Sequence, residues 1–233
     1  MSVCTRFFIL LVAVHFISCG SVEEPDKTGG FIIWDSYSVT SLEIAESYRD
    51  SVQHLNLSSQ SLEELPDWVG SLPRLRTLIL DKNLLVKLPE SIGQLKNLEV
   101  LSVMDNKLTS LSSSIGNLTN LKELAVSINS LAALPKELGN LKNVTLFTCS
   151  NNKITNLPKE IRGMVSLKEL FASKNLLDSI PKSIAELDSL TDFYIAENNL
   201  SELPVELARL ANLECLDIYK NQFTELPSWI NQL

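Results

Sequence analysis

The sequence predicts an α/β repeat solenoid, in which coils of equal length stack side by side and their short strands form one parallel, concave β-sheet. Two observations predict it. An apolar residue begins a new unit every 23 residues from Val52 to Leu213, and a proline recurs once in almost every unit. A unit this small cannot bury its own apolar face, so neighbouring units must share one core.

Eight units with a period of 23 residues span residues 52–233, the eighth as far as its twenty-first position, and each fits the pattern LxxLxLxxNxLxxLPxxIxxLxx. Seven columns of this pattern are apolar in every unit. The alternation in LxLxx is typical of a strand, with the fourth and sixth residues inward and the third, fifth and seventh outward. Asn fills the ninth position except at Gln60, and Pro fills the fifteenth except at Ser112.

These columns resemble the leucine-rich repeat family, specifically its 23-residue class with LPxxI in the second half of each unit. The resemblance implies a right-handed coil with parallel strands on the concave side and short, irregular or 3-10 turns on the convex side. It also implies that the asparagines form a ladder that satisfies backbone groups where each strand turns away. Bacterial proteins of this kind are often implicated in adhesion, so the resemblance favours a non-enzymatic, protein-binding function.

We expect an N-terminal cap over residues 31–51, because an open solenoid end exposes its core. The segment Thr40–Glu43 has the spacing of a capping box and precedes a helical apolar stripe. This predicts a capping helix over residues 40–51, with Phe31–Trp34 as a lead-in strand. The stripe consists of Leu42, Ala45, Tyr48 and Val52.

The C-terminal end of the solenoid leaves three alternatives open. Trp229 and Ile230 are the last large apolar residues before Leu233. Trp229 folds over the open edge, or the edge pairs with a second copy to form a homodimer, or the sequence belongs to a longer protein. The homodimer is the alternative function that the sequence leaves open, with an assembly role in place of recognition.

The N-terminal segment is typical of an export signal. Arg6 precedes the apolar run Phe7–Ile17, which is too short to span a bilayer. The sequence Phe16-Ile17-Ser18-Cys19 resembles the lipobox of bacterial lipoproteins, which implies a signal peptide over residues 1–18 and acylation of Cys19. Residues 19–30 are polar and suit a flexible tether. We therefore expect a lipid-anchored protein of the cell envelope, on the outer membrane or cell surface; plain secretion is the alternative.

Composition argues against several other functions. The formal charge of −8 gives no basis for a phosphate-binding surface, so we expect no nucleic-acid partner. The two His and four Cys are too scattered for a metal site, and we find no cofactor-binding motif, so we expect neither metal nor cofactor. Cys149 occupies an inward position and Cys215 an outward one three units away, about 14 Å apart and too far for a disulfide.

The outward strand positions carry the candidate binding residues, because packing does not dictate their identity. Aromatic anchors ringed by carboxylates are typical of a protein-binding site, and the negative surface favours a partner with basic groups. The simpler alternative is aromatic pairing that only stiffens the sheet. The candidate partner-binding residues are Phe171, Tyr194, Tyr219, Glu169, Asp192, Asp217, Leu146, Met104 and Ile79.

A carboxylate-dependent hydrolase is the remote alternative. Glu169 and Asp192 share one outward column on adjacent strands, about 5 Å apart, which matches the separation in retaining glycosidases. A cation bridging these two residues and Asp217 is a further option. However, an open sheet does not exclude water or enclose a sugar, and we therefore expect no enzymatic activity.

Overall fold

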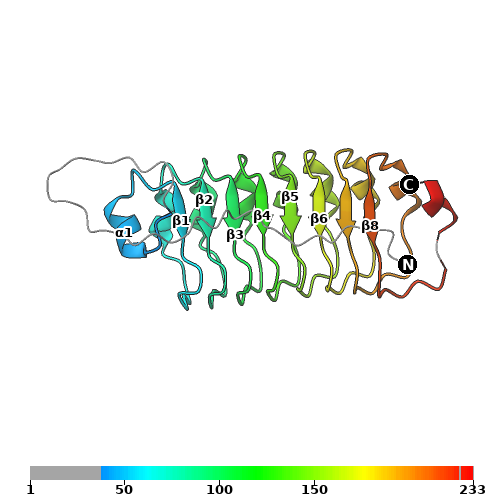
Figure 1. Cartoon of the computed structure of the whole chain (residues 1–233), viewed down its shortest axis with the longest axis horizontal. Coiled ribbons are helices and arrows are strands. Elements are labelled where there is room, and N and C mark those ends of the chain that lie inside the picture. Colours follow the sequence, from blue (N-terminus) through cyan, green and yellow to red (C-terminus); the bar gives the residue numbers. More distant parts are fainter. Residues whose placement is uncertain (1–37, 226, 233) are drawn as a thin grey trace.

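The computed structural model describes residues 38–225 and 227–232, which form a curved solenoid. Its eight strands are parallel and lie in sequence order in one sheet (Figure 1). Neighbouring strands pair residues 23 positions apart, so the sheet register equals the repeat length. The strands are β1 His54–Asn56, β2 Thr77–Ile79, β3 Val100–Ser102, β4 Glu123–Ala125, β5 Leu146–Thr148, β6 Glu169–Phe171, β7 Asp192–Tyr194 and β8 Cys215–Asp217.

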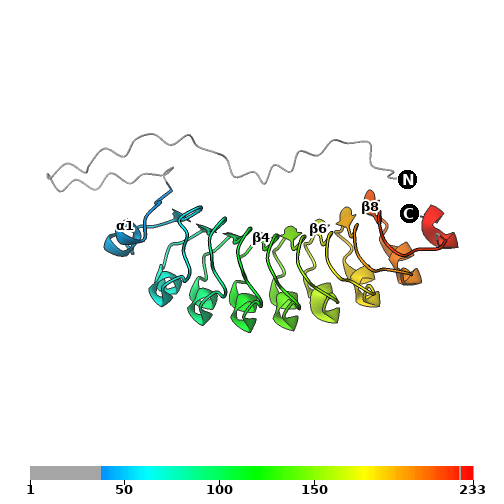
Figure 2. The ribbon, with the colours of Figure 1, turned by 90° about the horizontal axis from the view of Figure 1, so that it is seen from below.

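A five-residue 3-10 helix follows each strand and forms the convex side (Figure 2). Pro at the N-cap has ψ near 140°, an extended conformation that ends the loop and starts the turn. Ser112 replaces this Pro once and caps its helix with a side-chain hydrogen bond from the Ser114 N–H. The 3-10 helices are η1 Asp67–Ser71, η2 Glu90–Gln94, η3 Ser113–Asn117, η4 Lys136–Asn140, η5 Lys159–Gly163, η6 Lys182–Glu186, η7 Val205–Arg209 and η8 Ser228–Gln232. The predicted solenoid is thus confirmed.

The capping helix is shorter than predicted. Helix α1 spans Leu42–Ser47, and its N-cap is Ser41, whose hydroxyl accepts a hydrogen bond from the Ile44 N–H. Ala45 is fully buried, but Tyr48 is 46% exposed, so the apolar stripe ends one turn earlier than expected. The helix stops at Tyr48 because the chain must turn to enter the first strand.

The N-terminal edge of the sheet is covered by Val39, which forms a parallel bridge with Leu55 of β1. Its N–H donates to the His54 carbonyl, and its carbonyl accepts from the Asn56 N–H. The predicted lead-in strand Phe31–Trp34 lies outside the described residues. So do the predicted signal peptide, Cys19 and the tether.

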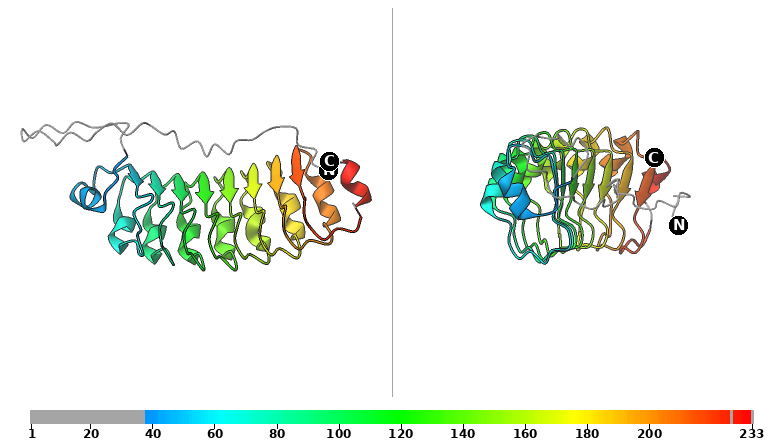
Figure 3. Two further views of the ribbon diagram at one scale, coloured as in Figure 1. Left: turned by 60° about the horizontal axis from the view of Figure 1, so that its bottom comes forward. Right: turned by 60° about the vertical axis from the view of Figure 1, so that its left-hand side comes forward.

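One apolar core runs the length of the solenoid between the sheet and the 3-10 helices. The inward fourth and sixth positions are fully buried in most coils, as the alternation predicts. Phe147 and Phe193 are the largest fully buried side chains, and each occupies a column that otherwise holds leucine. The coils stack closely enough that every strand and turn contacts its counterpart in the next coil (Figure 3).

The inward asparagines form a continuous ladder, as the resemblance implies. Asn175 illustrates it: its Oδ1 accepts from the Ile154 N–H at 3.1 Å, and its Nδ2 donates to the Cys149 and Ala172 carbonyls. Equivalent bonds recur from Asn83 to Asn221. Each amide therefore joins two coils and satisfies backbone groups that leave the sheet.

Each strand leaves the sheet through one residue in the left-handed backbone region, with φ between 51° and 60°. Only one of these residues is β-branched, namely Ile128, and it is 44% exposed beside the concave face. Most of the others are polar or charged, as this conformation allows. The column consists of Ser59, Lys82, Asp105, Ile128, Asn151, Lys174, Glu197 and Lys220.

At the C-terminal end, Trp229 belongs to the core and is 9% exposed. This agrees with the first of the three alternatives, in which it folds over the last coil. Leu216 of β8 and its neighbours Leu213 and Ile218 are only partly buried, and pairing of this edge with a second copy stays a prediction. In the described part of the chain, none of the helices has the length and apolar character needed to cross a bilayer.

Candidate functional site

The concave face of β5 to β8 gathers most of the candidate residues. Strand alternation turns the third and fifth positions outward, and the register places equivalent positions of adjacent strands next to each other. Glu169 thus pairs with Asp192, and Phe171 pairs with Tyr194. Asp217 follows Tyr194 on β8, and Leu146 precedes Glu169 on β5.

Phe171 and Tyr194 form an aromatic stack. Their ring centroids are 4.5 Å apart and their planes differ by 5°, so the rings lie face to face at about one strand spacing. Both side chains are half-buried, which leaves part of the stack accessible. Tyr219, further along β8, is 63% exposed, and Lys220 Nζ lies 5.5 Å from its ring centroid.

Carboxylates border the aromatic stack on one side. Glu123, Glu169 and Asp192 occupy the third position of their repeat units and begin β4, β6 and β7, and we call them the acidic row. Burial raises the pKa of Glu169, and the charges of Asp192 and Glu123 raise it further. Burial also raises the pKa of Glu123. The Tyr194 hydroxyl donates to Asp192 Oδ1 at 3.4 Å.

Charge repulsion and burial in the acidic row predict a pH-dependent stability. The folded-state pKa of Glu169 is raised, so its charged form destabilises the fold above that pKa and has no effect below the unfolded value of 4.5. We expect Glu169→Gln to increase the free energy of unfolding at pH 7 by at most about 0.5 kcal/mol, given solvent screening. At about pH 3 the variant and the wild type should be equally stable.

Urea titrations at the two pH values measure this difference. Glu63→Gln is the matched control, because Glu63 is an exposed residue of the first coil outside the acidic row. A stabilisation by Glu169→Gln that persists unchanged at low pH would contradict the expected cause.

The second predicted group of apolar residues is less accessible than expected. Ile79 is only 7% exposed, because the neighbouring coils cover it, whereas Met104 is half-buried. Asp81 lies beside them, and its Oδ1 accepts from the Ser102 hydroxyl and the Met104 N–H. Burial raises the pKa of Asp81. This polar contact joins the coils of β2 and β3 next to Ile79. Because Ile79 itself is nearly covered, it offers little surface to a partner.

The remaining reactive side chains are structural. Cys149 is fully buried, and burial raises the pKa of its thiol to about 12. Cys215 stands in an outward column yet is 5% exposed. His54 Nδ1 lies 3.0 Å from Thr77 Oγ1, and burial lowers the pKa of this histidine.

Neither the hydrolase nor the cation alternative gains support from the geometry. Glu169 and Asp192 are cross-strand neighbours as predicted, but they stand on the open concave face. Two hollows lie elsewhere, on the flank where the chain enters the strands. Among residues 38–225 and 227–232, no three His, Cys, Asp or Glu side chains are grouped so that they could hold a metal ion.

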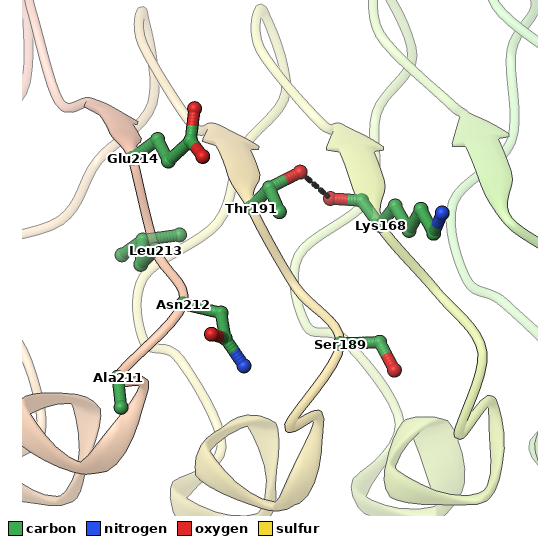
Figure 4. A pocket seen from close by; sticks show the side chains of 7 residues that line it. All are labelled: Lys168, Ser189, Thr191, Ala211, Asn212, Leu213 and Glu214. Carbon is green, nitrogen blue, oxygen red and sulfur yellow. Dashed lines mark hydrogen bonds between the residues drawn. The ribbon is translucent and has the colours of Figure 1, made fainter.

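These flank hollows reveal a second ladder that the sequence analysis missed. In the larger, of about 550 Å³, Asn97, Asn120 and Asn143 each donate through Nδ2 to a carbonyl of the preceding coil at 2.7–2.8 Å. Figure 4 shows the smaller hollow, where Asn212 and Ser189 continue the column. Asn or Ser recurs at the last position of successive units, so a repeat-by-repeat alignment contained the signal.

Comparison with known proteins supports the repeat architecture. Residues 51–147 match the family described as leucine-rich repeat region, and residues 212–233 match the family described as leucine rich repeat. A search of curated proteins finds no match. Among solved structures 444 chains match, so the architecture alone does not select a ligand.

Three solved structures illustrate which kinds of protein share this architecture. A leucine-rich repeat protein of Leptospira interrogans is 30% identical, with TM-score 0.62 over 84% of this chain and 62% of that chain. A plant peptide hormone receptor, RGFR1 in complex with RGF2, is 29% identical, with TM-score 0.71 over 78% of this chain and 31% of that chain. The internalin InlF of Listeria monocytogenes, at 22% identity and TM-score 0.74, shares the fold over 84% of this chain and 55% of that one. The chain thus spans less than two thirds of each of these proteins.

Proposed function

Because this chain is a leucine-rich repeat protein, we propose that it is a non-enzymatic recognition protein that holds a protein partner on its concave sheet. The observation that carries the proposal is the partly exposed aromatic stack of Phe171 and Tyr194 beside the acidic row. Aromatic residues are enriched in protein–protein interfaces, and tyrosine is enriched in their binding hot spots. Leucine-rich repeat proteins are generally non-catalytic binding scaffolds, and the related plant receptor is described in complex with RGF2.

The solenoid suits this function physically. Every strand is held by the core and by the asparagine ladder, so the concave face is formed before a partner arrives. Binding then requires little ordering of the backbone, which lowers its entropic cost. The strands form one continuous curved sheet (Figure 3). Their register therefore places outward side chains from several coils on the same face, which a partner can contact along the solenoid axis.

A double variant tests the surface. Phe171→Ala/Tyr194→Ala should abolish most partner capture in crosslinking and pull-down from intact cells, because it removes the aromatic contact area. The matched control is Val86→Ala/Val165→Ala, which truncates two side chains that are 50% and 52% exposed outside the concave columns. Undiminished capture by a folded double variant would remove the stack from the binding site.

The same proposal places the protein at the cell envelope, anchored by acylated Cys19 on the outer membrane or cell surface. The support is the lipobox-like sequence before Cys19 and the polar segment that follows it. Two or three acyl chains bury enough methylene groups for stable membrane attachment. Cys19→Ser should release the protein into the soluble fraction, measured by membrane fractionation. A variant that partitions like the wild type would contradict the anchor while leaving the binding surface untouched.

A further inference from the structure

We infer that the partner presents an arginine side chain to the aromatic stack and the acidic row; this rests on the proposed function of the concave face. The inference names the chemistry of the partner group: a planar guanidinium that lies against the rings and pairs with the Glu169 and Asp192 carboxylates. Three features of the surface support it.

The first feature is a local excess of negative charge. Some carboxylates elsewhere on the solenoid are paired with cations of neighbouring coils: Glu99 contacts Arg76 and Lys122 at 2.9 and 2.5 Å, and Glu206 contacts Lys182 at 3.0 Å. In the described coils, by contrast, no cation lies within ion-pair distance of the acidic row or Asp217. These four carboxylates share the concave face without a neutralising cation from the described part of the chain, so a cation of a partner can approach them there.

The second feature is that the fold destabilises the charged forms of carboxylates in the acidic row. Burial and mutual repulsion raise the pKa of Glu169, and burial raises that of Glu123. The charge of Lys168 opposes this shift at Glu169, but its ammonium forms no ion pair with that carboxylate within the described coils. A cation placed here by a partner relieves the repulsion, so its charge contributes more to binding than it would at an exposed carboxylate.

The third feature is an unmet hydrogen-bond requirement in the same place. Thr148 Oγ1 is fully buried without a hydrogen-bond partner, although it lies in an outward column of β5. Thr148 is the cross-strand neighbour of Phe171. Unsatisfied buried polar groups are uncommon, and this one lies next to the aromatic stack, although its oxygen is covered in the free protein.

Stacking favours arginine over lysine. The rings lie parallel and one strand spacing apart, so a planar cation can continue the stack, whereas an ammonium cannot. Glu169 and Asp192 each lie two residues before a ring on the same strand face, within reach of the N–H groups of a stacked guanidinium. Tyr219 is not part of this proposed arginine contact. Its exposed ring already has a cation of its own chain above it, since Lys220 Nζ lies 5.5 Å from the ring centroid.

Peptide selection on the full chain tests the inference. Peptides of about 12 residues, displayed on phage, are selected against the purified protein in detergent and then synthesised with each arginine kept, or replaced by lysine or by citrulline. Citrulline keeps the planar shape but lacks the charge. We expect selected peptides to contain arginine, to weaken about tenfold or more with citrulline and less with lysine, and to bind less tightly at high salt.

Two double variants assign this preference to the surface. Glu169→Gln/Asp192→Asn should remove most of the arginine-to-citrulline difference, whereas Glu63→Gln/Glu64→Gln, the control with the same change in net charge, should retain it. Urea unfolding confirms that each variant is folded.

The possible outcomes separate the inference from the proposed function. Selected peptides that need Phe171 and Tyr194 but tolerate citrulline, or bind equally well with lysine, would overturn the arginine inference alone. Failure to enrich arginine on the wild type would overturn it as well. Peptides that bind Phe171→Ala/Tyr194→Ala as tightly as the wild type would instead overturn the proposed function of this surface.

Discussion

Phe147→Ala is expected to lower the free energy of unfolding by about 3–5 kcal/mol. The Phe147 side chain is fully buried in the middle of the solenoid, where its backbone pairs with Leu124 on one side and Leu170 on the other. Truncation leaves a cavity that the neighbouring coils cannot close, because each coil is held in register by backbone hydrogen bonds on both sides. The loss therefore combines lost apolar burial with a persistent cavity.

Urea denaturation followed by circular dichroism measures this effect. Phe147→Leu is the matched control, since leucine occupies the same column in most other coils, and it should cost only about 1 kcal/mol. If both variants lose stability equally, the loss does not depend on how much side-chain volume is removed, and the cavity argument is wrong.

Asn175→Ala is expected to cost about 3 kcal/mol. The Asn175 side chain is 6% exposed. It accepts from the Ile154 N–H and donates to the carbonyls of Cys149, Ala172 and Ser173 at 3.0–3.3 Å. Alanine leaves these backbone groups buried and without the amide, so the variant loses stability in two coils at once.

Asn143→Ala provides the comparison within the second ladder. Asn143 is exposed and donates one hydrogen bond, to the Thr119 carbonyl at 2.8 Å. Water can replace that bond, so we expect a loss of only about 0.5–1 kcal/mol in the same urea titration. Similar losses from both substitutions would show that burial of the inward ladder adds nothing to its strength.

Much of the candidate site could be predicted because adjacent strands pair residues that are 23 positions apart, which is also the length of the repeat. Residues 23 apart become cross-strand neighbours, so the pairing of Phe171 with Tyr194 and of Glu169 with Asp192 followed from spacing alone. The accessibility of Ile79 did not. An outward position on a short strand is exposed only if the adjacent coils leave space, and around Ile79 they do not.

The N-terminal cap is a second feature that the sequence predicted only in part. The apolar stripe correctly indicated a helix before the first repeat, but not that it ends at Ser47 and leaves Tyr48 exposed. A stripe records which residues are apolar, whereas the end of a helix depends on where the chain must turn to join the sheet. The second ladder was missed for a different reason: its Asn and Ser residues recur at the last position of the unit, outside the apolar columns that define the repeat.

By itself, the sequence determined the number of coils, the order and register of the strands and the side chains that point inward, because a fixed repeat length leaves one way to stack amphipathic units into a common core. Only the tertiary structure decided which outward groups keep solvent contact, which carboxylates lack a cation and how the rings lie against each other. Those properties depend on distances between side chains of adjacent coils, and no single repeat contains them.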